Sequence, residues 1–293
     1  ADLAGEGLAA ALSDVRVDLV SHHAAQIDVR VSVADPVRDA RVNLVGLLNL
    51  LEVLRAEDLP PLVFASSGGV MYGEAEVIPT PEGAPKQLFS PYGVAKLASE
   101  YYLQYYARVY GLRYAALRYS NVYGPRQNPE GEAGVVAIFS GKALRDEPLT
   151  VYGTGEQDRD FVYVGDVAEA NWLASRALTG GAPSPAPEPE SAGGPAARTS
   201  EEPVDEPAFN VATGQATTVL ELAQAFGRLA GRELEVRRAP PRSGELLHST
   251  LDCSKAASRL GWSARTPLHE GLDATYRFFQ RARTGQHARG TDA

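Results

Sequence analysis

Tyr92 and Lys96 are the residues of this sequence whose types and spacing most directly suggest chemistry. Because they are four residues apart, their side chains lie on the same face of a helix. A lysine ammonium in that place favours the phenolate and would lower the pKa of the tyrosine. A tyrosine tuned in this way can act as a general base toward a sugar hydroxyl near neutral pH. The same spacing also occurs in helices that carry an ordinary surface pair, so the surrounding sequence has to decide.

Three further blocks of the sequence accompany this pair. Residues 64–73 contain Ser66 and Ser67 in a turn-prone stretch at the end of an apolar run. A hydroxyl in that place could hydrogen-bond the same substrate oxygen as the tyrosine. Residues 117–126 and 153–168 follow downstream. Taken in this order and spacing, the four blocks are a far more specific signal than the Tyr-x-x-x-Lys spacing alone.

The pattern of apolar residues predicts strands that alternate with helices. We expect helices over 8–12, 42–55, 92–109 and about 219–231, and short buried strands over 15–22, 62–65 and 114–117. This alternation is typical of an α/β fold with a parallel sheet. Ligands of such sheets bind beyond the carboxyl ends of the strands, and polar or glycine-rich residues follow all three predicted strands.

The bulk composition is that of a soluble globular protein with one large or two smaller domains. The chain has 293 residues, of which 44% are hydrophobic and 22% are charged, and its net charge is -9. An acidic protein repels nucleic acids and anionic membranes, so we expect neither as a partner. The sequence has no apolar run that approaches the length of a membrane span. With Cys253 as its single cysteine, it is expected to form no intramolecular disulfide and suits the cytoplasm.

Residues 180–207 differ from the rest of the chain because they are rich in proline, glycine and glutamate and have almost no large apolar side chains. Such a segment buries too little surface to offset the entropy of ordering it. We interpret it as a disordered surface insertion, in preference to a polyproline docking segment.

In their order and spacing, the four blocks resemble those of the extended short-chain dehydrogenase/reductase family, and most closely the UDP-glucose 4-epimerase group of the NAD-dependent epimerase/dehydratases. The likeness runs from Asp2 to about Phe279, apart from the proline-rich segment. It implies an NAD-binding, doubly wound parallel sheet of the Rossmann type in residues 1–124. It also implies a smaller, mainly substrate-binding α/β subdomain in residues 125–293, which binds a nucleotide sugar such as a UDP-hexose.

The resemblance further implies roles for single residues. The catalytic residues would be Tyr92 as the base, Lys96 as its partner, and Ser67. The cofactor would contact Asp2, Leu3, Ala24, Ala25, Asn43, Ser66, Tyr92, Lys96, Tyr119 and Ser120. The substrate would contact Ser67, Tyr92, Asn121, Arg159, Arg242 and Glu245, with the arginines on the diphosphate because their forked donors match phosphate oxygens. His22 and His23 are interpreted as packed residues at a strand end, since the chemistry needs neither.

The mechanism that the resemblance implies is redox chemistry carried by the cofactor. Tyr92 would remove the proton of the sugar 4-hydroxyl while hydride passes from carbon 4 to NAD⁺. The 4-keto sugar would then turn in the pocket and take the hydride back on its other face, which gives the 4-epimer without net oxidation. The resemblance also implies a homodimer formed through the helices over 42–55 and 92–109, although the apolar residues there could equally face the core.

The first departure from the family pattern concerns the hydroxyl next to the tyrosine. The family's Ser or Thr usually stands four residues before the tyrosine of a Tyr-Gly pair, and that position, counted from Tyr72, is Gly68 here. Ser67 is therefore our candidate for this hydroxyl, with Ser66 as the second choice. The pair Gly68-Gly69 also argues against sugar dehydratases and decarboxylases, which resemble Thr-Asp-Glu or Thr-Ser-Glu at this place and use the acidic residue for elimination.

The second departure is that the sequence has no Gly-x-x-Gly-x-x-Gly motif, whose glycines bring the backbone and a helix N-terminus close to the pyrophosphate. Gly5 and Gly7 do not form one, because no strand precedes them. Compared with the family, the sequence is N-terminally truncated and begins near the end of the third strand, roughly sixty residues into the fold. Taken literally, it is expected to bind NAD poorly and to expose a sheet edge.

Three hypotheses follow. The leading one is an NAD-dependent nucleotide-sugar epimerase that interconverts UDP-glucose and UDP-galactose. The second is a related epimerase or reductase for another nucleotide sugar, such as a uronic acid or N-acetyl sugar, because the residues around Asn121 and Phe161 do not decide between them. The third is an inactive homologue without NAD binding, and the absent glycine motif is the feature that supports it.

Overall fold

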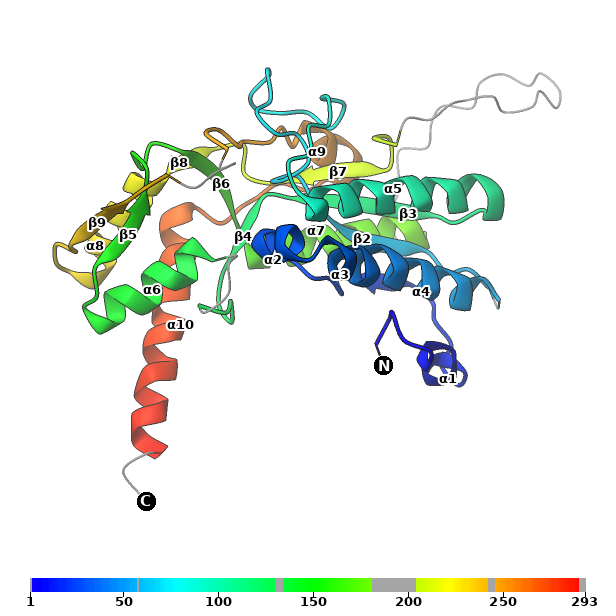
Figure 1. Ribbon diagram of the computed structural model, residues 1–293, viewed down its shortest axis with the longest axis horizontal. Coiled ribbons are helices and arrows are strands. Elements are labelled where there is room, and N and C mark those ends of the chain that lie inside the picture. Colours follow the sequence, from blue (N-terminus) through cyan, green and yellow to red (C-terminus); the bar gives the residue numbers. More distant parts are fainter. Residues whose placement is uncertain (1, 57, 130–133, 181–203, 242–245, 290–293) are drawn as a thin grey trace.

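The computed structural model places a parallel sheet between layers of helices, with a smaller group of strands and helices beside it (Figure 1). It describes residues 2–56, 58–129, 134–180, 204–241 and 246–289, with side chains up to residue 283. The helices are α1 (Leu8–Leu12), α2 (Val29–Ala34), α3 (Pro36–Ala40), the π-helix η1 (Arg41–Val45), α4 (Gly46–Arg55), α5 (Pro91–Tyr110), α6 (Val135–Arg145), α7 (Val164–Thr179), α8 (Val219–Ala230), α9 (Ser254–Leu260) and α10 (Leu268–Arg289). The strands are β1 (Val20–His22), β2 (Leu62–Ser67), β3 (Tyr114–Tyr119), β4 (Asn121–Tyr123), β5 (Leu149–Tyr152), β6 (Asp158–Tyr163), β7 (Ala208–Val211), β8 (Ala216–Thr218) and β9 (Val236–Ala239).

The main sheet has the strand order β1-β2-β3-β7, and all neighbouring strands in it are parallel. In the register of the two central strands, Ser67 at the end of β2 lies beside Tyr119 at the end of β3. The carboxyl ends of parallel strands meet at one edge of a sheet, which is the edge where ligands of such folds bind. The α/β fold class predicted from the alternation of strands and helices is therefore confirmed.

Both faces of the main sheet are covered, because side chains of a strand point alternately to its two sides. On one side, Phe64 of β2 packs with Leu51 of α4 and Leu103 of α5. On the other side, Val63 of β2 packs in one cluster with residues of α7 and with Trp262, which follows α9. Truncation of a fully buried side chain such as Leu103 to alanine would cost about 2 to 5 kcal/mol of stability. The two apolar layers thus hold β2 and α5 firmly in relation to each other.

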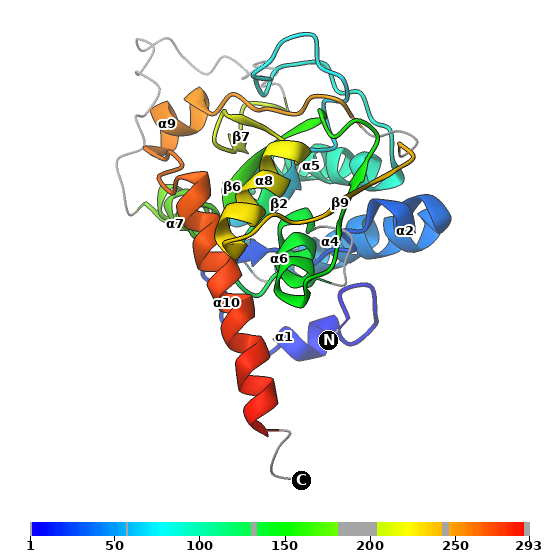
Figure 2. The ribbon, with the colours of Figure 1, turned by 90° about the vertical axis from the view of Figure 1, so that its left-hand side faces the viewer.

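The second group of elements is built on shorter strand pairs. β4 pairs with β6 in parallel, β6 with β8 antiparallel, and β5 with β9 in parallel. Their shared core contains Phe139 of α6, Val151 of β5, Phe161 of β6, Phe226 of α8 and Leu272 of α10. Figure 2 shows this group face-on, with α6 and α8 beside α10, which continues away from the body of the protein.

Helix α5 has clear start and stop signals in the sequence. Ser90 caps its N-terminus by accepting a hydrogen bond from Gly93 N at 3.1 Å, and Pro91 occupies the first turn. Gly111 ends the helix in the left-handed conformation, with φ +75. These signals place Tyr92 and Lys96 in the first two turns, against the end of β2.

Two sequence-based expectations need correction. The strand expected over 15–22 is limited to β1, because Pro60 and Pro61 precede the neighbouring strand β2 and proline cannot donate to a ladder. The segment 180–207 is expected from its sequence to be disordered. The structure describes both of its ends, residue 180 and residues 204–207, while residues 181–203 lie outside the described residues. Gly180 caps α7, Val204 is buried, and the carboxylate of Asp205 accepts hydrogen bonds from buried Arg118. Apolar burial and an ion pair order these ends.

None of the helices in the described part of the chain is both long enough and apolar enough to cross a membrane.

Candidate active site

Tyr92 and Ser67 meet where helix α5 faces the carboxyl end of β2. Their side chains are neighbours in the lining of one cavity, and the Ser67 hydroxyl favours the phenolate of Tyr92. One turn further along the helix, Lys96 donates from Nζ to the carbonyl oxygen of Ala65 at 2.7 Å. The spacing of four residues puts Tyr92 and Lys96 on one helix face, as the sequence predicted. The Lys96 bond therefore joins the helix to the strand end, and it places Tyr92 next to Ser67.

The pKa of Tyr92 differs from the sequence-based expectation. The pKa of Tyr92 is raised to about 12, chiefly by burial of the phenol and to a smaller extent by the Asp39 carboxylate, while the Ser67 hydroxyl acts in the opposite direction. The expected lowering by Lys96 is therefore wrong for this structure. The reason is geometric, because the ammonium donates to Ala65 O and lies 5.8 Å from the centroid of the Tyr92 ring.

Lys96 is almost fully buried, and this governs its charge. Burial lowers its pKa to about 8, while the carboxylates of Glu100 and Asp39 raise it. The ammonium also lies 4.7 Å from the centroid of the Phe64 ring, where a cation is attracted by the π-system. At neutral pH Lys96 thus keeps its proton, and it provides a positive charge close to Tyr92.

The backbone at Gly68 and Gly69 explains why the hydroxyl beside Tyr92 comes from Ser67. Both glycine N–H groups donate to the carbonyl oxygen of Tyr119, at 2.8 and 3.3 Å. A Cβ on Gly68 would lie 2.4 Å from Cδ1 of buried Leu251, far inside van der Waals contact. A serine or threonine at position 68 would therefore clash, and the preceding residue carries the hydroxyl.

A cavity of about 600 Å³ opens at the carboxyl ends of β2 and β3. Its lining includes six of the residues predicted to contact cofactor or substrate, which are Ser66, Ser67, Tyr92, Tyr119, Ser120 and Asn121. Tyr119 is fixed by a bond from its hydroxyl to Asn171 Oδ1 at 2.9 Å. The hydroxyl oxygen of Ser120 is buried and has no hydrogen-bond partner among the described residues. An unpartnered buried hydroxyl is costly and marks a place where a ligand can bind.

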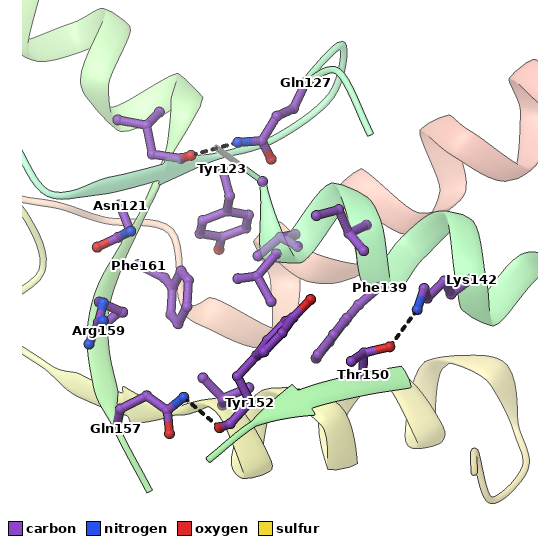
Figure 3. A pocket seen from close by; sticks show the side chains of 16 residues that line it. Asn121, Tyr123, Gln127, Phe139, Lys142, Thr150, Tyr152, Gln157, Arg159 and Phe161 are labelled. Atoms are coloured by element: carbon purple, nitrogen blue, oxygen red, sulfur yellow. Dashed lines mark hydrogen bonds between the residues drawn. The ribbon is translucent and has the colours of Figure 1, made fainter. Parts of the chain in front are cut away.

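A second cavity, of about 320 Å³, lies between β4, β6 and α6 (Figure 3). Asn121 lines both cavities, so the two are adjacent. Figure 3 shows Asn121, Arg159 and Gln157 along one side and Lys142 with Thr150 at the other, and the Tyr152 ring lies between them. Lys142 Nζ donates to Thr150 Oγ1 at 2.8 Å. A wall with arginine and lysine next to aromatic rings suits a ligand that combines anionic groups with a flat ring.

Asn43 holds the loop that follows β1. Its amide accepts from Gln26 N at 2.8 Å and donates to Gln26 O and to Asp39 Oδ1, both at 2.9 Å. Ala24 and Ala25 precede Gln26 in this loop, and neither lines the cavity at the ends of β2 and β3. Asn43 thus acts on the predicted cofactor segment through the backbone rather than with a free amide.

Besides Ala24, Ala25, Asn43 and Lys96, two described residues of the predicted site, Asp2 and Leu3, line neither cavity, and two more predicted residues cannot be placed. Asp2 is exposed, and its carboxylate accepts a hydrogen bond from Ala4 N at 3.0 Å. Leu3 packs against α1 and α4. Arg242 and Glu245 lie outside the described residues.

The interpretation of His22 as a packed residue is confirmed, because its ring is buried and stacks on Phe64 with the centroids 5.8 Å apart. His23 differs, since it is exposed at the strand end and stacks on Tyr119 at 6.4 Å. The pKa of His22 is lowered to about 4, chiefly by burial and to a smaller extent by the charges of Lys96 and His23. Neither imidazole is hydrogen-bonded to Tyr92 in the structure.

Sequence reasoning missed several residues of the site. Glu100 is buried next to the site, and the sequence could have indicated it, because it follows Lys96 by four residues on the same helix face. Asp39, also fully buried, had no such signal, because burial is set by the packing of α3 against α5. Lys142 and Tyr152 reach the second cavity from α6 and β5, which the sequence pattern did not predict. Among the described residues, no group of His, Cys, Asp or Glu side chains could hold a metal ion.

The comparisons with known proteins decide the family. The profile of the NAD dependent epimerase/dehydratase family matches residues 1–185. The chain belongs to this family. The resemblance drawn from the four sequence blocks is thereby confirmed, together with the enzyme class and the dependence on NAD.

Relatives within the family share the fold and most of the sequence length. The UDP-glucose 4-epimerase of Mycolicibacterium smegmatis is 38% identical over 280 residues, which are 96% of this chain and 82% of that protein. The crystal structure of UDP-glucose 4-epimerase with UDP-glucose from Thermotoga maritima has a TM-score of 0.84 and 40% identity, and covers 96% of this chain and 84% of that one. The crystal structure of the Thermus thermophilus UDP-glucose 4-epimerase complex with NAD has a TM-score of 0.81 and 42% identity. The match covers 96% of this chain and 83% of that one.

Proposed function

We propose that this family member interconverts UDP-glucose and UDP-galactose by epimerisation at carbon 4. The observation that carries the proposal is that Ser67 and Tyr92 lie together in the lining of a cavity that also contains the unpartnered hydroxyl of Ser120. The relatives named above, which are UDP-glucose 4-epimerases, support the same substrate. The glycines at 68 and 69 support it too, because they offer no acid for elimination chemistry.

The roles of the residues follow from their positions. Ser67 and Tyr92 would hold the sugar 4-hydroxyl between them, and Tyr92 would accept its proton and later return it. With a pKa of about 12, Tyr92 is protonated before cofactor and substrate bind, so phenolate formation depends on further positive charge at the site. The cationic nicotinamide ring of NAD⁺ would add that charge when bound, next to the Lys96 ammonium, which lies 5.8 Å from the centroid of the Tyr92 ring.

The residues at the sheet edge fit the nicotinamide half of NAD. The cofactor, when bound, supplies the reversible acceptance of hydride from carbon 4 of the sugar. The unpartnered Ser120 hydroxyl offers a polar contact, and Tyr119 and Ser66 line the same cavity. Lys96, one helix turn beyond Tyr92, would hold the ribose. Each of these residues would bind and orient the cofactor. The neighbouring ends of β2 and β3 in the sheet keep them in place.

The adjacent cavity of about 320 Å³ is our proposed site for the nucleotide half of the substrate. Arg159 would contact the diphosphate with its forked donors. The rings of Tyr152 and Phe139, together with the amide of Gln157, would receive the base and the ribose. Asn121, which lines both cavities, would contact the sugar where the two spaces meet.

A panel of nucleotide sugars tests the substrate assignment. The NAD-loaded protein is incubated separately with UDP-glucose, UDP-N-acetylglucosamine and UDP-glucuronic acid, and the products are followed by proton NMR. We expect conversion of UDP-glucose to UDP-galactose with the highest kcat/KM of the panel. Faster turnover of an N-acetyl or uronic acid sugar would replace the proposed substrate and keep the reaction type.

We further propose that the active form is a homodimer joined through α5 and the helix formed by η1 and α4. Tyr101, Tyr105 and Val109 follow one another at intervals of four residues on α5 and are 54%, 46% and 55% exposed. An apolar stripe of this kind suits the same stripe on a second copy. Light scattering should give a dimer for the protein and a monomer for Tyr105→Glu, and a monomeric wild type would contradict the proposal. A cytoplasmic location stays part of the proposal and rests on the single cysteine of the sequence.

A further inference from the structure

Ser66 and Glu100 form a buried contact directly behind the active site. Ser66 Oγ donates to Glu100 Oε1 at 2.5 Å. Ser66 is 3% exposed and Glu100 is fully buried. The residues on either side of Ser66 face the same side of α5, because Ala65 O accepts a hydrogen bond from Lys96 and the Ser67 side chain lies beside Tyr92. Three consecutive residues of β2 thus face three α5 residues spaced four apart, and Ala65 and Ser66 are hydrogen-bonded to theirs.

The charge of Glu100 is matched by Arg118 of β3. Arg118 donates to both Glu100 carboxylate oxygens, from Nη2 at 2.5 Å and from Nε at 3.1 and 3.2 Å, and both side chains are fully buried. Arg118 also donates to Tyr72 OH and to Glu82 O, both at 3.0 Å, and to Asp205 Oδ1 at 2.8 Å. These bonds fix the orientation of the carboxylate, so Glu100 is a rigid anchor and not a mobile acid.

Glu100 also contributes to the electrostatic surroundings of Lys96. The charged and titratable groups that act on or with Lys96 are Glu100 on its own helix, Asp39 on α3, Tyr92, and the histidines His22 and His23 at the end of β1. Both carboxylates favour the ammonium, and burial opposes it. Both histidines have their pKa values lowered by burial and by Lys96, so they are neutral at pH 7.

We propose that Glu100 is a positioning residue for the reaction, which fixes the end of β2 through Ser66 and places a buried negative charge one helix turn from Lys96 on the same face of α5. This inference rests on the proposed function of the Ser67–Tyr92 pair. The bond to Ser66 determines the direction in which the next residue, Ser67, points. A small shift of that hydroxyl would misplace the sugar 4-hydroxyl relative to Tyr92, and displacements of this size reduce rates strongly.

The positional part of the proposal is tested with Ser66→Ala, which removes one hydroxyl and leaves the Glu100–Arg118 pair intact. Ser140→Ala is the matched control, because Ser140 is also fully buried and its Oγ donates to Val136 O at 2.8 Å in α6. We expect kcat to fall about tenfold in Ser66→Ala with KM within about twofold, and to stay unchanged in Ser140→Ala. A wild-type kcat in Ser66→Ala would overturn this part, whatever its melting temperature.

The electrostatic part is tested with Glu100→Gln by a measurement that does not depend on turnover. Lysine labelled with ¹³C at Cε reports the titration of Lys96 in NMR spectra of the cofactor-free protein, and Lys96→Arg assigns the signal. We expect the titration midpoint to lie about one pH unit lower in Glu100→Gln than in the wild type, and to be unchanged in Ser66→Ala. An unmoved midpoint in a folded Glu100→Gln protein would overturn this part. If that variant does not fold, Ser66→Ala decides the positional role.

The experiments distinguish a failure of the proposed function from a failure of the proposed role of Glu100. A wild-type protein that epimerises no nucleotide sugar contradicts the proposed function. A wild-type protein that is active while Ser66→Ala is equally active contradicts only the role of Glu100.

Discussion

Ser67 at the end of strand β2 and Tyr92 in the first turn of helix α5 lie side by side in the lining of one cavity. The contact depends on two backbone features. The capped start of α5 at Ser90 places Tyr92 in the first turn, and the glycine at 68 lets the chain pass close to Leu251 directly after Ser67. The pair therefore lies at the edge of the sheet, where its two hydroxyls can share one substrate oxygen.

Replacement of Tyr92 by phenylalanine should abolish turnover and leave NAD bound. The phenol oxygen is the group that takes the proton, whereas the ring contributes only packing. We expect kcat to fall by at least about 10³-fold and the melting temperature to change little. Bound NAD is measured by its release on denaturation. Epimerisation at an unchanged rate would show that the base is another residue.

Ser67→Ala should slow catalysis more than Ser66→Ala. The Ser67 hydroxyl lies beside Tyr92, while that of Ser66 donates to Glu100. We expect a loss in kcat of about 10²-fold for Ser67→Ala, because removal of a transition-state hydrogen bond has effects of this size. Initial rates of the two variants at saturating substrate provide the comparison. The opposite ranking would mean that the hydroxyls have been assigned the wrong way round.

Gly68→Ala should destabilise the protein. The added Cβ would lie 2.4 Å from Leu251 Cδ1 and 3.2 Å from Arg118 O, and both neighbours are buried. We expect the free energy of unfolding to fall by about 1 to 3 kcal/mol. Gly83→Ala is the control, since a Cβ there meets nothing within 4 Å.

Urea unfolding of both glycine variants measures this effect. Leu251→Ala in the Gly68→Ala background should recover part of the loss, because it removes the atom that clashes. Equal stability of the two single variants would contradict the packing of Leu251 against the loop.

His22 should make the fold sensitive to acid. Its pKa is lowered from 6.5 to about 4 by burial, so the unfolded chain takes up a proton at a higher pH than the folded protein does. The stability linked to His22 is therefore complete above pH 6.5 and declines as the pH falls toward 4. The loss amounts to about 3 kcal/mol at most.

His22→Phe keeps the stacking on Phe64 and removes the titration. The difference in unfolding free energy between wild type and His22→Phe, measured at pH 7 and at pH 4.5, isolates this contribution. We expect the unfolding free energy of the wild type, relative to that of His22→Phe, to be lower at pH 4.5 than at pH 7. A difference that does not depend on pH would show that the histidine is not neutral in the folded protein.

Local features of the sequence predicted the catalytic helix and the strand ends well, because caps, spacing and apolar runs act over a few residues. Tyr92, Lys96 and Ser67 belong to this class. The direction of the Tyr92 pKa could not be predicted, because burial of the phenol and the bond from Lys96 to Ala65 depend on how α5 packs on the sheet.

Other features depend on contacts between segments far apart in the chain. Arg118 joins Glu100, 18 residues away, to Asp205, 87 residues away, and no periodicity reveals such a triad. The order of residues 204–207 follows from this contact. Glu100 itself could have been proposed from its spacing to Lys96, since the helix repeat places both on one face.

The fate of the hydrogen on carbon 4 tests the central claim most directly. UDP-[4-²H]glucose is incubated with the NAD-loaded protein in ordinary water, and the product is analysed by NMR and mass spectrometry. Transfer to the cofactor and back within one pocket predicts UDP-galactose that keeps its deuterium on carbon 4. Absence of UDP-galactose, or a product whose deuterium has been exchanged for solvent hydrogen, would contradict the account.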